Sequence, residues 1–63
     1  MIQVGRKYRH FKGGVYEVLM LALNTDHNNI DVVYRNSDNQ VFTRNYDTWF
    51  DDVRPDVKKD LKK

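Results

Sequence analysis

The sequence predicts a mainly β domain, built as a small, strongly bent antiparallel sheet or barrel of the Src-homology-3-like type. Apolar and polar residues alternate with period two over several short segments. Turns rich in glycine, asparagine and aspartate separate these segments. The chain has only 63 residues, and a flat sheet of this size would leave one apolar face in water. The alternative is an open three- or four-stranded sheet with one helix packed on it.

The first predicted element is a β-hairpin. Residues 7–11 form a short strand candidate, and residues 15–23 form the strongest strand candidate of the chain. Between them, Gly13 and Gly14 supply the positive φ angles that tight hairpin turns need. Both faces of the second segment are largely apolar from Val18 onward. This pattern predicts a central strand that is covered on both sides or bends sharply.

Two further strands are predicted, each after a polar turn. Residues 24–29 form a polar loop, and the next segment, residues 30–35, places Ile30, Val32 and Tyr34 on one face. Residues 36–39 are rich in turn formers and predict a second turn. Residues 40–44 then form a shorter and more polar strand candidate.

A single helical turn is predicted near residues 46–50, where the period-two pattern stops. Asn45 or Asp47 has the side chain that caps such a turn. The spacing of Tyr46, Trp49 and Phe50 suits one helical face. We therefore expect the three rings to pack against the open end of the sheet. Val53 is expected to return to the sheet afterwards.

The chain is expected to form one small domain over residues 1–53, followed by a basic C-terminal tail over residues 54–63. The tail has five basic and two acidic residues, whereas residues 1–53 have six basic and seven acidic ones. The positive net charge is therefore a property of the tail and gives little support for nucleic-acid binding. With two apolar residues spaced four apart, the tail predicts a short marginal helix or a frayed end.

Composition argues against several classes of function. The chain has no cysteine and only two histidines, so neither a metal site nor a cofactor is expected. Its one serine, Ser37, lies in a turn, and the pair Gly13-Gly14 precedes a strand instead of a helix, so neither nucleophilic catalysis nor a phosphate-binding loop is expected. We therefore expect no enzyme. No apolar run approaches the roughly 18 residues of a membrane span, and a cytoplasmic location without membrane association is expected.

The first half of the chain is similar to a known sequence pattern. It is carried by the segments YRHFKG at residues 8–13, VYEV at residues 15–18 and VVYR at residues 32–35, with Asp26 in the loop between the last two. On these segments the chain resembles a family of small bacterial and phage proteins catalogued as a domain of unknown function. The resemblance implies a small β-barrel-like fold and a prokaryotic or phage source. It implies no activity, cofactor or site residue.

The resemblance weakens in the second half of the chain. It continues through Phe42-Thr43-Arg44 and Phe50 and spans about residues 5–53. Phe42 stands where the family pattern has tryptophan, and Asn45 stands where it has the proline of an Arg-Pro pair. The segment after Val53 has no clear counterpart in the pattern. We therefore expect the tail to be specific to this protein.

A cluster of basic and aromatic side chains is the main functional signal. On one face of a twisted barrel, arginines pair with phosphates and aromatic rings stack on bases. This predicts a non-enzymatic binding module for an anionic ligand, either a nucleotide or a nucleic acid. The same charges have a second interpretation as edge-strand protection, paired with Glu17, Asp31 or Asp26. The candidate ligand-binding residues are Arg9, His10, Lys12, Tyr16, Arg35 and Arg44.

The alternative function is a protein–protein interaction module, such as a phage-encoded inhibitor that binds a host protein in the host cytoplasm. Its marker would be an exposed apolar patch built from Tyr46, Trp49 and Phe50. A homo-oligomer is compatible with both functions. It would form if residues 40–44 paired with the same strand of another copy and extended the sheet.

Overall fold

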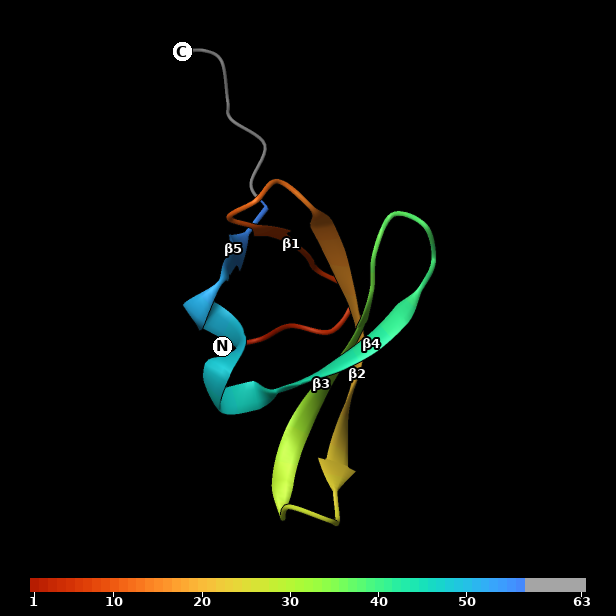
Figure 1. Ribbon diagram of the computed structural model, residues 1–63, viewed down its shortest axis with the longest axis vertical. Coiled ribbons are helices and arrows are strands. Elements are labelled where there is room, and N and C mark those ends of the chain that lie inside the picture. The colour runs from red at the N-terminus through yellow and green to blue at the C-terminus, as the bar shows by residue number, and fades with distance from the viewer. Residues whose placement is uncertain (57–63) are drawn as a thin grey trace.

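The computed structural model describes residues 1–56, which form five strands and one 3-10 helical turn (Figure 1). The elements are β1 (Lys7–His10), β2 (Val15–Asn24), β3 (Asn29–Arg35), β4 (Val41–Asn45), η1 (Tyr46–Asp51) and β5 (Val53–Pro55). The two ends of each predicted strand lie within one residue of the observed ends. Short alternating segments bounded by turn residues leave little freedom in where a strand begins and ends. The predicted helical turn and the return of Val53 to the sheet are also confirmed.

The strands form one antiparallel sheet in the order β4-β3-β2-β1-β5, which confirms the predicted mainly β fold. Within residues 1–56, the end strands β4 and β5 do not pair with each other, so the sheet is bent but does not close into a barrel. Instead, η1 joins β4 to β5 and contacts β3, β4 and β5 (Figure 1). The six residues of η1 thus cover the face that the open sheet would otherwise expose at this end.

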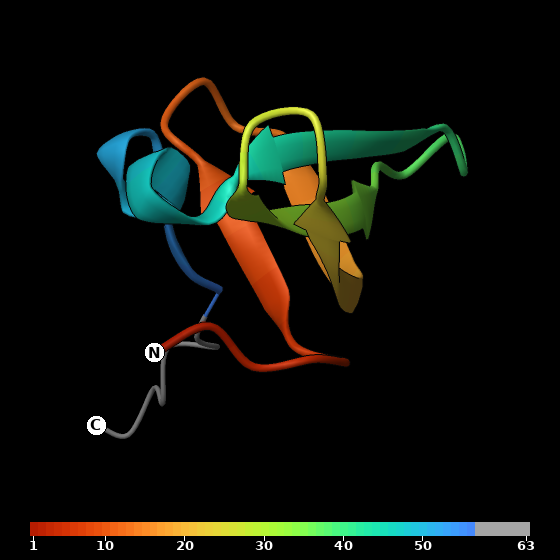
Figure 2. The same cartoon turned by 90° about the horizontal axis from the view of Figure 1, so that it is seen from below.

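The long strand β2 bends through a β-bulge. Its pairing with β3 shifts in register between Val18 and Met20, which leaves Leu19 unpaired in the ladder. A bulge of this kind bends its strand and increases the local twist. Beyond the bulge, the β2–β3 hairpin extends away from the rest of the sheet, and Figure 2 looks along it from its tip. The expected sharp bend is therefore present, whereas cover on both faces is not, since Leu21 and Leu23 are exposed.

The turns use residues that the sequence indicates, although in the predicted Gly13-Gly14 pair Gly13 takes a positive φ angle and Gly14 does not. Gly13, with a φ of 104°, reverses the chain between β1 and β2, and its N–H donates to the carbonyl of His10 at 2.8 Å. Asn28 and Asn39 take positive φ angles of 53° and 64° in the other two turns. Asparagine tolerates this conformation better than most residues with a side chain. The cap of η1 is Asn45, whose side-chain oxygen accepts the N–H of Asp47 at 2.7 Å.

The core lies on the concave side of the sheet, which we call the inner face. Trp49 of η1 is fully buried there and contacts two tyrosine rings edge-on, with centroids 5.5 Å away for Tyr8 and 5.0 Å away for Tyr34. Each edge-on pair adds about 0.5–1.5 kcal/mol to the effect of burial. Tyr46 packs against this core while partly exposed. The fully or nearly fully buried residues are Ile2, Tyr8, Val18, Val32, Trp49 and Val53.

The N-terminal segment makes buried contacts within the domain that the sequence did not predict. Ile2 is buried in the core, and the N–H of Gln3 donates to the hydroxyl oxygen of Tyr8 at 3.0 Å. The N–H of Gly5 donates to the carbonyl of Val18 at 2.8 Å. These contacts supply a partner for the hydroxyl of a buried tyrosine and hold the segment against β2.

The predicted boundary between domain and tail falls inside a strand. β5 continues to Pro55, pairing Arg54 with Arg9 and Pro55 with Tyr8. The N–H of Asp56 then donates to the carbonyl of Lys7 at 3.0 Å. The short helix or frayed end predicted for the tail falls mostly on residues 57–63, which lie outside the described residues.

Replacing the central ring of the core should unfold or strongly destabilise the domain. We expect Trp49→Ala to lower the free energy of unfolding by about 3–5 kcal/mol, because it removes a fully buried indole and its two aromatic contacts. Phe50→Ala is the control, since Phe50 is 36% exposed and should lose about 1 kcal/mol. Urea titration followed by circular dichroism measures both values. Equal losses for the two variants would contradict the central role of Trp49.

Candidate functional site

The six candidate ligand-binding residues do not share one face. Residues that pair across an antiparallel ladder point to the same side, and Tyr16 pairs with the buried Tyr8. By the same register, His10 lies with Val53, and Arg44 lies with Val32, so these three candidates belong to the inner face. Arg9 and Arg35 alternate with inner-face residues and therefore lie on the opposite, outer face. Lys12 lies in the β1–β2 turn.

A continuous line of aromatic side chains, which we call the aromatic row, begins at Phe11 in the β1–β2 turn and continues on the inner face through His10, Tyr16, Tyr34 and Phe42. Successive ring centroids are 4.5, 5.9, 4.9 and 5.7 Å apart in that order. The row crosses from the end of β1 through β2 and β3 to β4. The two end rings are the most open, Phe11 at 71% exposure and Phe42 at 41%, and the three central rings are half-buried.

Local contacts set the orientation of the rings near β1. The Nδ1 atom of His10 accepts the backbone N–H of Lys12 at 3.1 Å, which fixes one edge of the imidazole toward the turn. Gly14 lies against the ring of Tyr16, where an added Cβ would come within 3.7 Å of Cε1. Two turn residues that the sequence assigns to the hairpin thus also position two rings of the aromatic row.

Two cations accompany the aromatic row. The Nζ atom of Lys12 is 5.7 Å from the ring centroid of Phe11, within the range of a cation–π contact. Arg44 forms an ion pair with Asp52, at 2.7 Å between Nη2 and Oδ2, with both side chains partly exposed. The pair holds the guanidinium beside Tyr34, where its charge favours the tyrosinate form. The site therefore combines stacking surface with a modest positive charge.

Tyr34 has a hydroxyl whose pKa is raised above the ordinary value of a tyrosine. Burial raises the pKa of its hydroxyl, and the neighbouring Tyr16 raises it further, while Arg44 opposes both effects. Desolvation disfavours the charged phenolate, which explains the sign. Tyr34 is thus neutral at physiological pH and presents its ring to both Tyr16 and Phe42.

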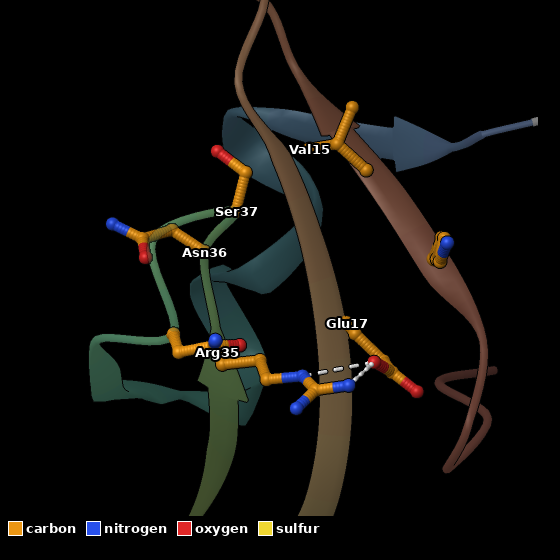
Figure 3. Close-up of a pocket in the computed structure, with 7 residues that line it drawn as sticks. Val15, Glu17, Arg35, Asn36 and Ser37 are labelled. Carbon is orange, nitrogen blue, oxygen red and sulfur yellow. Dashed lines mark hydrogen bonds and ion pairs between the residues drawn. The ribbon is translucent and has the colours of Figure 1, made fainter.

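The two outer-face arginines form ion pairs with carboxylates. Arg35 donates two hydrogen bonds to Oε1 of Glu17, at 2.6 and 3.0 Å, and this pair was among those expected from edge protection (Figure 3). Arg9 donates to Oδ1 of Asp56 at 3.1 Å and to the carbonyl of Gly13 at 3.2 Å. Exposed pairs of this kind contribute about 0–1 kcal/mol to stability.

Two open hollows mark the surface of the described residues. The first, about 340 Å³, lies on the outer face and contains the Arg35–Glu17 pair, with Lys7 and the β3–β4 turn at its margin (Figure 3). The second, about 450 Å³, lies beside the Phe11 end of the aromatic row, and its lining charges cancel. That lining is Arg9, Phe11, Asp51, Asp52 and Arg54.

The alternative site does not form the exposed patch that the sequence predicted. Trp49 is fully buried, and Tyr46 packs against the core. Phe50 is 36% exposed and contacts Tyr8, with ring centroids 5.9 Å apart. The spacing of these three residues correctly indicated one helical face, but that face points into the core. Trp49 therefore cannot contact a partner without opening the core.

Residues 1–56 contain no group of three or more histidine and acidic side chains that could hold a metal ion. In the same part of the chain, no helix has the length and apolarity needed to cross a membrane.

Sequence reasoning missed three members of the aromatic row as site residues, namely Phe11, Tyr34 and Phe42. The alternation of residues 30–35 placed Tyr34 on the inner face, and the pairing of Tyr34 with Phe42 shows how the row continues.

The fold and the site define a small domain with an open, strongly bent antiparallel sheet and an aromatic inner face. The chain belongs to the family described as "Protein of unknown function (DUF1653)", whose model matches residues 6–60. The match confirms the resemblance to a domain of unknown function. It also extends past Val53, so the expectation that the tail has no family counterpart was wrong for residues 54–60. Neither the curated proteins nor the solved structures gave a match to the chain.

The raised pKa of Tyr34 predicts a loss of stability in alkaline solution. Above pH of about 10, the ordinary tyrosine pKa, the unfolded chain releases this proton while the folded protein still holds it. The folded state then binds more protons than the unfolded state, so the free energy of unfolding falls as pH rises toward the folded pKa. The decrease should be smaller in Tyr34→Phe, measured by urea titration at a series of alkaline pH values. If the free energy of unfolding falls equally with pH in both proteins, the raised pKa does not belong to Tyr34.

Proposed function

We propose that this protein is a non-enzymatic binding module whose aromatic row stacks on the bases of a nucleotide or a single-stranded nucleic acid. The observation that supports the proposal is the aromatic row itself: five rings, each within 6 Å of the next, of which four lie on the inner face of β1 to β4 and the fifth, Phe11, lies in the adjoining turn. Stacking on a base contributes about 1–3 kcal/mol for each ring that is removed.

The charge near the row supports an anionic ligand. Lys12 lies next to the exposed Phe11 ring, and Arg44 lies next to the central ring of Tyr34. A base stacked on the exposed ring of Phe42, beside Tyr34, would lie near Arg44, whose ion pair with Asp52 is partly exposed. Of the sequence candidates, His10, Lys12, Tyr16 and Arg44 stay in this proposal. Arg9 and Arg35 do not, because they lie on the outer face.

Stacking on exposed rings favours a single strand over a duplex. A duplex hides its bases in the helical stack, whereas the bases of a single strand are free to stack on protein rings. The open end rings, Phe11 and Phe42, allow a strand to enter and leave the row. The ligand class is thus a short single strand or a mononucleotide.

A protein-interaction module is the second candidate, on a surface different from the predicted one. The β2–β3 hairpin extends beyond the rest of the sheet and exposes Leu23 at 68% and Ile30 at 47%, which pair across it (Figure 1). Exposed apolar side chains that lie together are typical of protein interfaces. Leu23→Ser tests this surface without touching the aromatic row.

Binding of a labelled single strand tests the leading proposal. We expect a fluorescein-labelled thymidine oligonucleotide of about ten residues to bind at about 50 mM salt, where phosphate contacts are strongest, as read by fluorescence anisotropy. Phe42→Ala should weaken binding about tenfold, because it removes one exposed stacking ring. Phe50→Ala is the matched control, since Phe50 has similar exposure and lies outside the row.

Three outcomes would contradict the proposal. One is the absence of binding to oligonucleotide and to free nucleotide at this salt concentration. A second is an equal loss of affinity in Phe42→Ala and Phe50→Ala. The third is a loss in Leu23→Ser with none in Phe42→Ala, which would place the oligonucleotide on the β2–β3 hairpin instead of the aromatic row.

A further inference from the structure

The two edges of the sheet differ in how well they are protected against pairing. β5 has three residues and contains both Pro55 and a charged residue, Arg54, which are two common ways to block an edge. β4 has five residues, no proline, no lysine and no acidic side chain, and its register with β3 continues without a bulge. Val41 is 58% exposed, and Phe42 and Thr43 are exposed as well. β4 is therefore an open template for another strand.

We propose that β4 pairs with β4 of a second copy of this chain, antiparallel and about a two-fold axis at Thr43. The two sheets then join into one continuous sheet across the dimer. This inference is independent of the proposed ligand, because it rests on backbone groups and edge residues.

A hydrogen bond at the end of the β3–β4 ladder indicates which backbone groups of β4 are free for this pairing. The N–H of Asn36 donates to the carbonyl of Gln40 at 3.0 Å, at the end of the β3–β4 ladder. Hydrogen-bonded and non-hydrogen-bonded pairs alternate along an antiparallel ladder. By this alternation, Phe42 and Arg44 direct their N–H and C=O groups toward β3. Val41, Thr43 and Asn45 direct theirs toward the free edge, where the carbonyl of Asn45 already accepts the hydroxyl of Thr48 at 3.3 Å.

A two-fold axis at Thr43 uses the free groups of Val41 and Thr43 and the N–H of Asn45. Thr43 then faces Thr43 of the second copy in a hydrogen-bonded pair. Val41 faces Asn45 twice by symmetry, and in each pair the N–H of Asn45 donates to the carbonyl of Val41. On the inner face, Phe42 lies opposite Arg44 of the second copy, a cross-strand pair of a ring and a cation. On the outer face, the two threonines lie side by side, a favourable cross-strand pair.

The neighbouring registers are less favourable. A shift in one direction sets Arg44 directly opposite Arg44 of the second copy, and like charges in that position destabilise a sheet. A shift in the other direction sets Asn45 opposite Asn39. Asn39 has a φ of 64° and belongs to the turn, so the ladder cannot continue there. The sequence of β4 therefore selects the register centred on Thr43.

The oligomeric state of the full chain tests the proposal. Sedimentation equilibrium up to millimolar concentration should give a mass of two chains of 7.6 kDa, in a reversible equilibrium with the monomer. Thr43→Pro should be monomeric over the same range, because it removes an N–H that points away from β3 and is needed only by the second copy. Thr43→Lys is a second variant that keeps the N–H and sets two like charges opposite each other.

Cross-linking tests the register, because the native chain has no cysteine. In a hydrogen-bonded pair the two Cα atoms are about 5.5 Å apart, within the span of a disulfide, so Thr43→Cys should form a disulfide-linked dimer rapidly in air. Val41→Cys is the matched control in the same strand. The two residues at position 41 would lie about 13 Å apart or more, since four residues separate them along the strand, and they should not cross-link.

A monomeric native chain at millimolar concentration would overturn the proposal. So would a dimer whose mass is unchanged in both Thr43→Pro and Thr43→Lys while circular dichroism shows that the variants are folded. Cross-linking of Val41→Cys as fast as Thr43→Cys would overturn the register. None of these results depends on nucleotide or nucleic-acid binding, so failure of the dimer and failure of the proposed function are distinguishable.

Discussion

The structure depends on the burial of one indole ring. Trp49 lies between Tyr8 and Tyr34, which come from strands on opposite sides of β2, and its contacts with both rings hold the bent sheet in shape. Among the described residues, its Nε1 atom is buried without a hydrogen-bond partner. An unmet N–H costs about 1–3 kcal/mol, so burial of the ring must exceed that amount. The sheet can stay open at its edges because this ring fills the inner face where η1 covers it.

The same arrangement explains why the aromatic row is accessible. η1 has six residues and covers only the part of the inner face around Trp49. A chain of this size buries only about 60% of its unfolded surface, so some exposed apolar groups are unavoidable and carry no meaning singly. The aromatic row differs from such scattered groups because its rings are in successive contact across four segments. Contiguity, and not exposure alone, is what makes the row a candidate site.

Local patterns predicted the strands, but not the faces on which their charges lie. Alternation predicted residues 30–35 almost as observed, and of the two predicted caps, Asn45 and Asp47, the structure has Asn45. Arg9 and His10 are neighbours in sequence and therefore point to opposite faces of β1, so a cluster read along the sequence could not remain a cluster in the sheet. The partner of Arg9 is Asp56, which lies 47 positions away and is brought close only by β5. Pairings at that separation depend on topology, which local spacing does not specify.

The ion pairs also limit what kind of ligand the inner face can favour. Among residues 1–56, Lys12 and Arg44 are the cations placed against rings of the row, and Asp52 already neutralises Arg44. Arg9 and Arg54 share a hollow with Phe11, but Asp51 and Asp52 balance their charge there. A phosphate that competes with a partly exposed carboxylate displaces a contact of about 0–1 kcal/mol, so Arg44 remains available to a ligand. With so few cations, however, phosphate neutralisation can supply only a small part of the affinity, and stacking must supply the rest. The geometry thus favours a ligand with exposed bases over one recognised by its charge, which agrees with the near-neutral charge of residues 1–53.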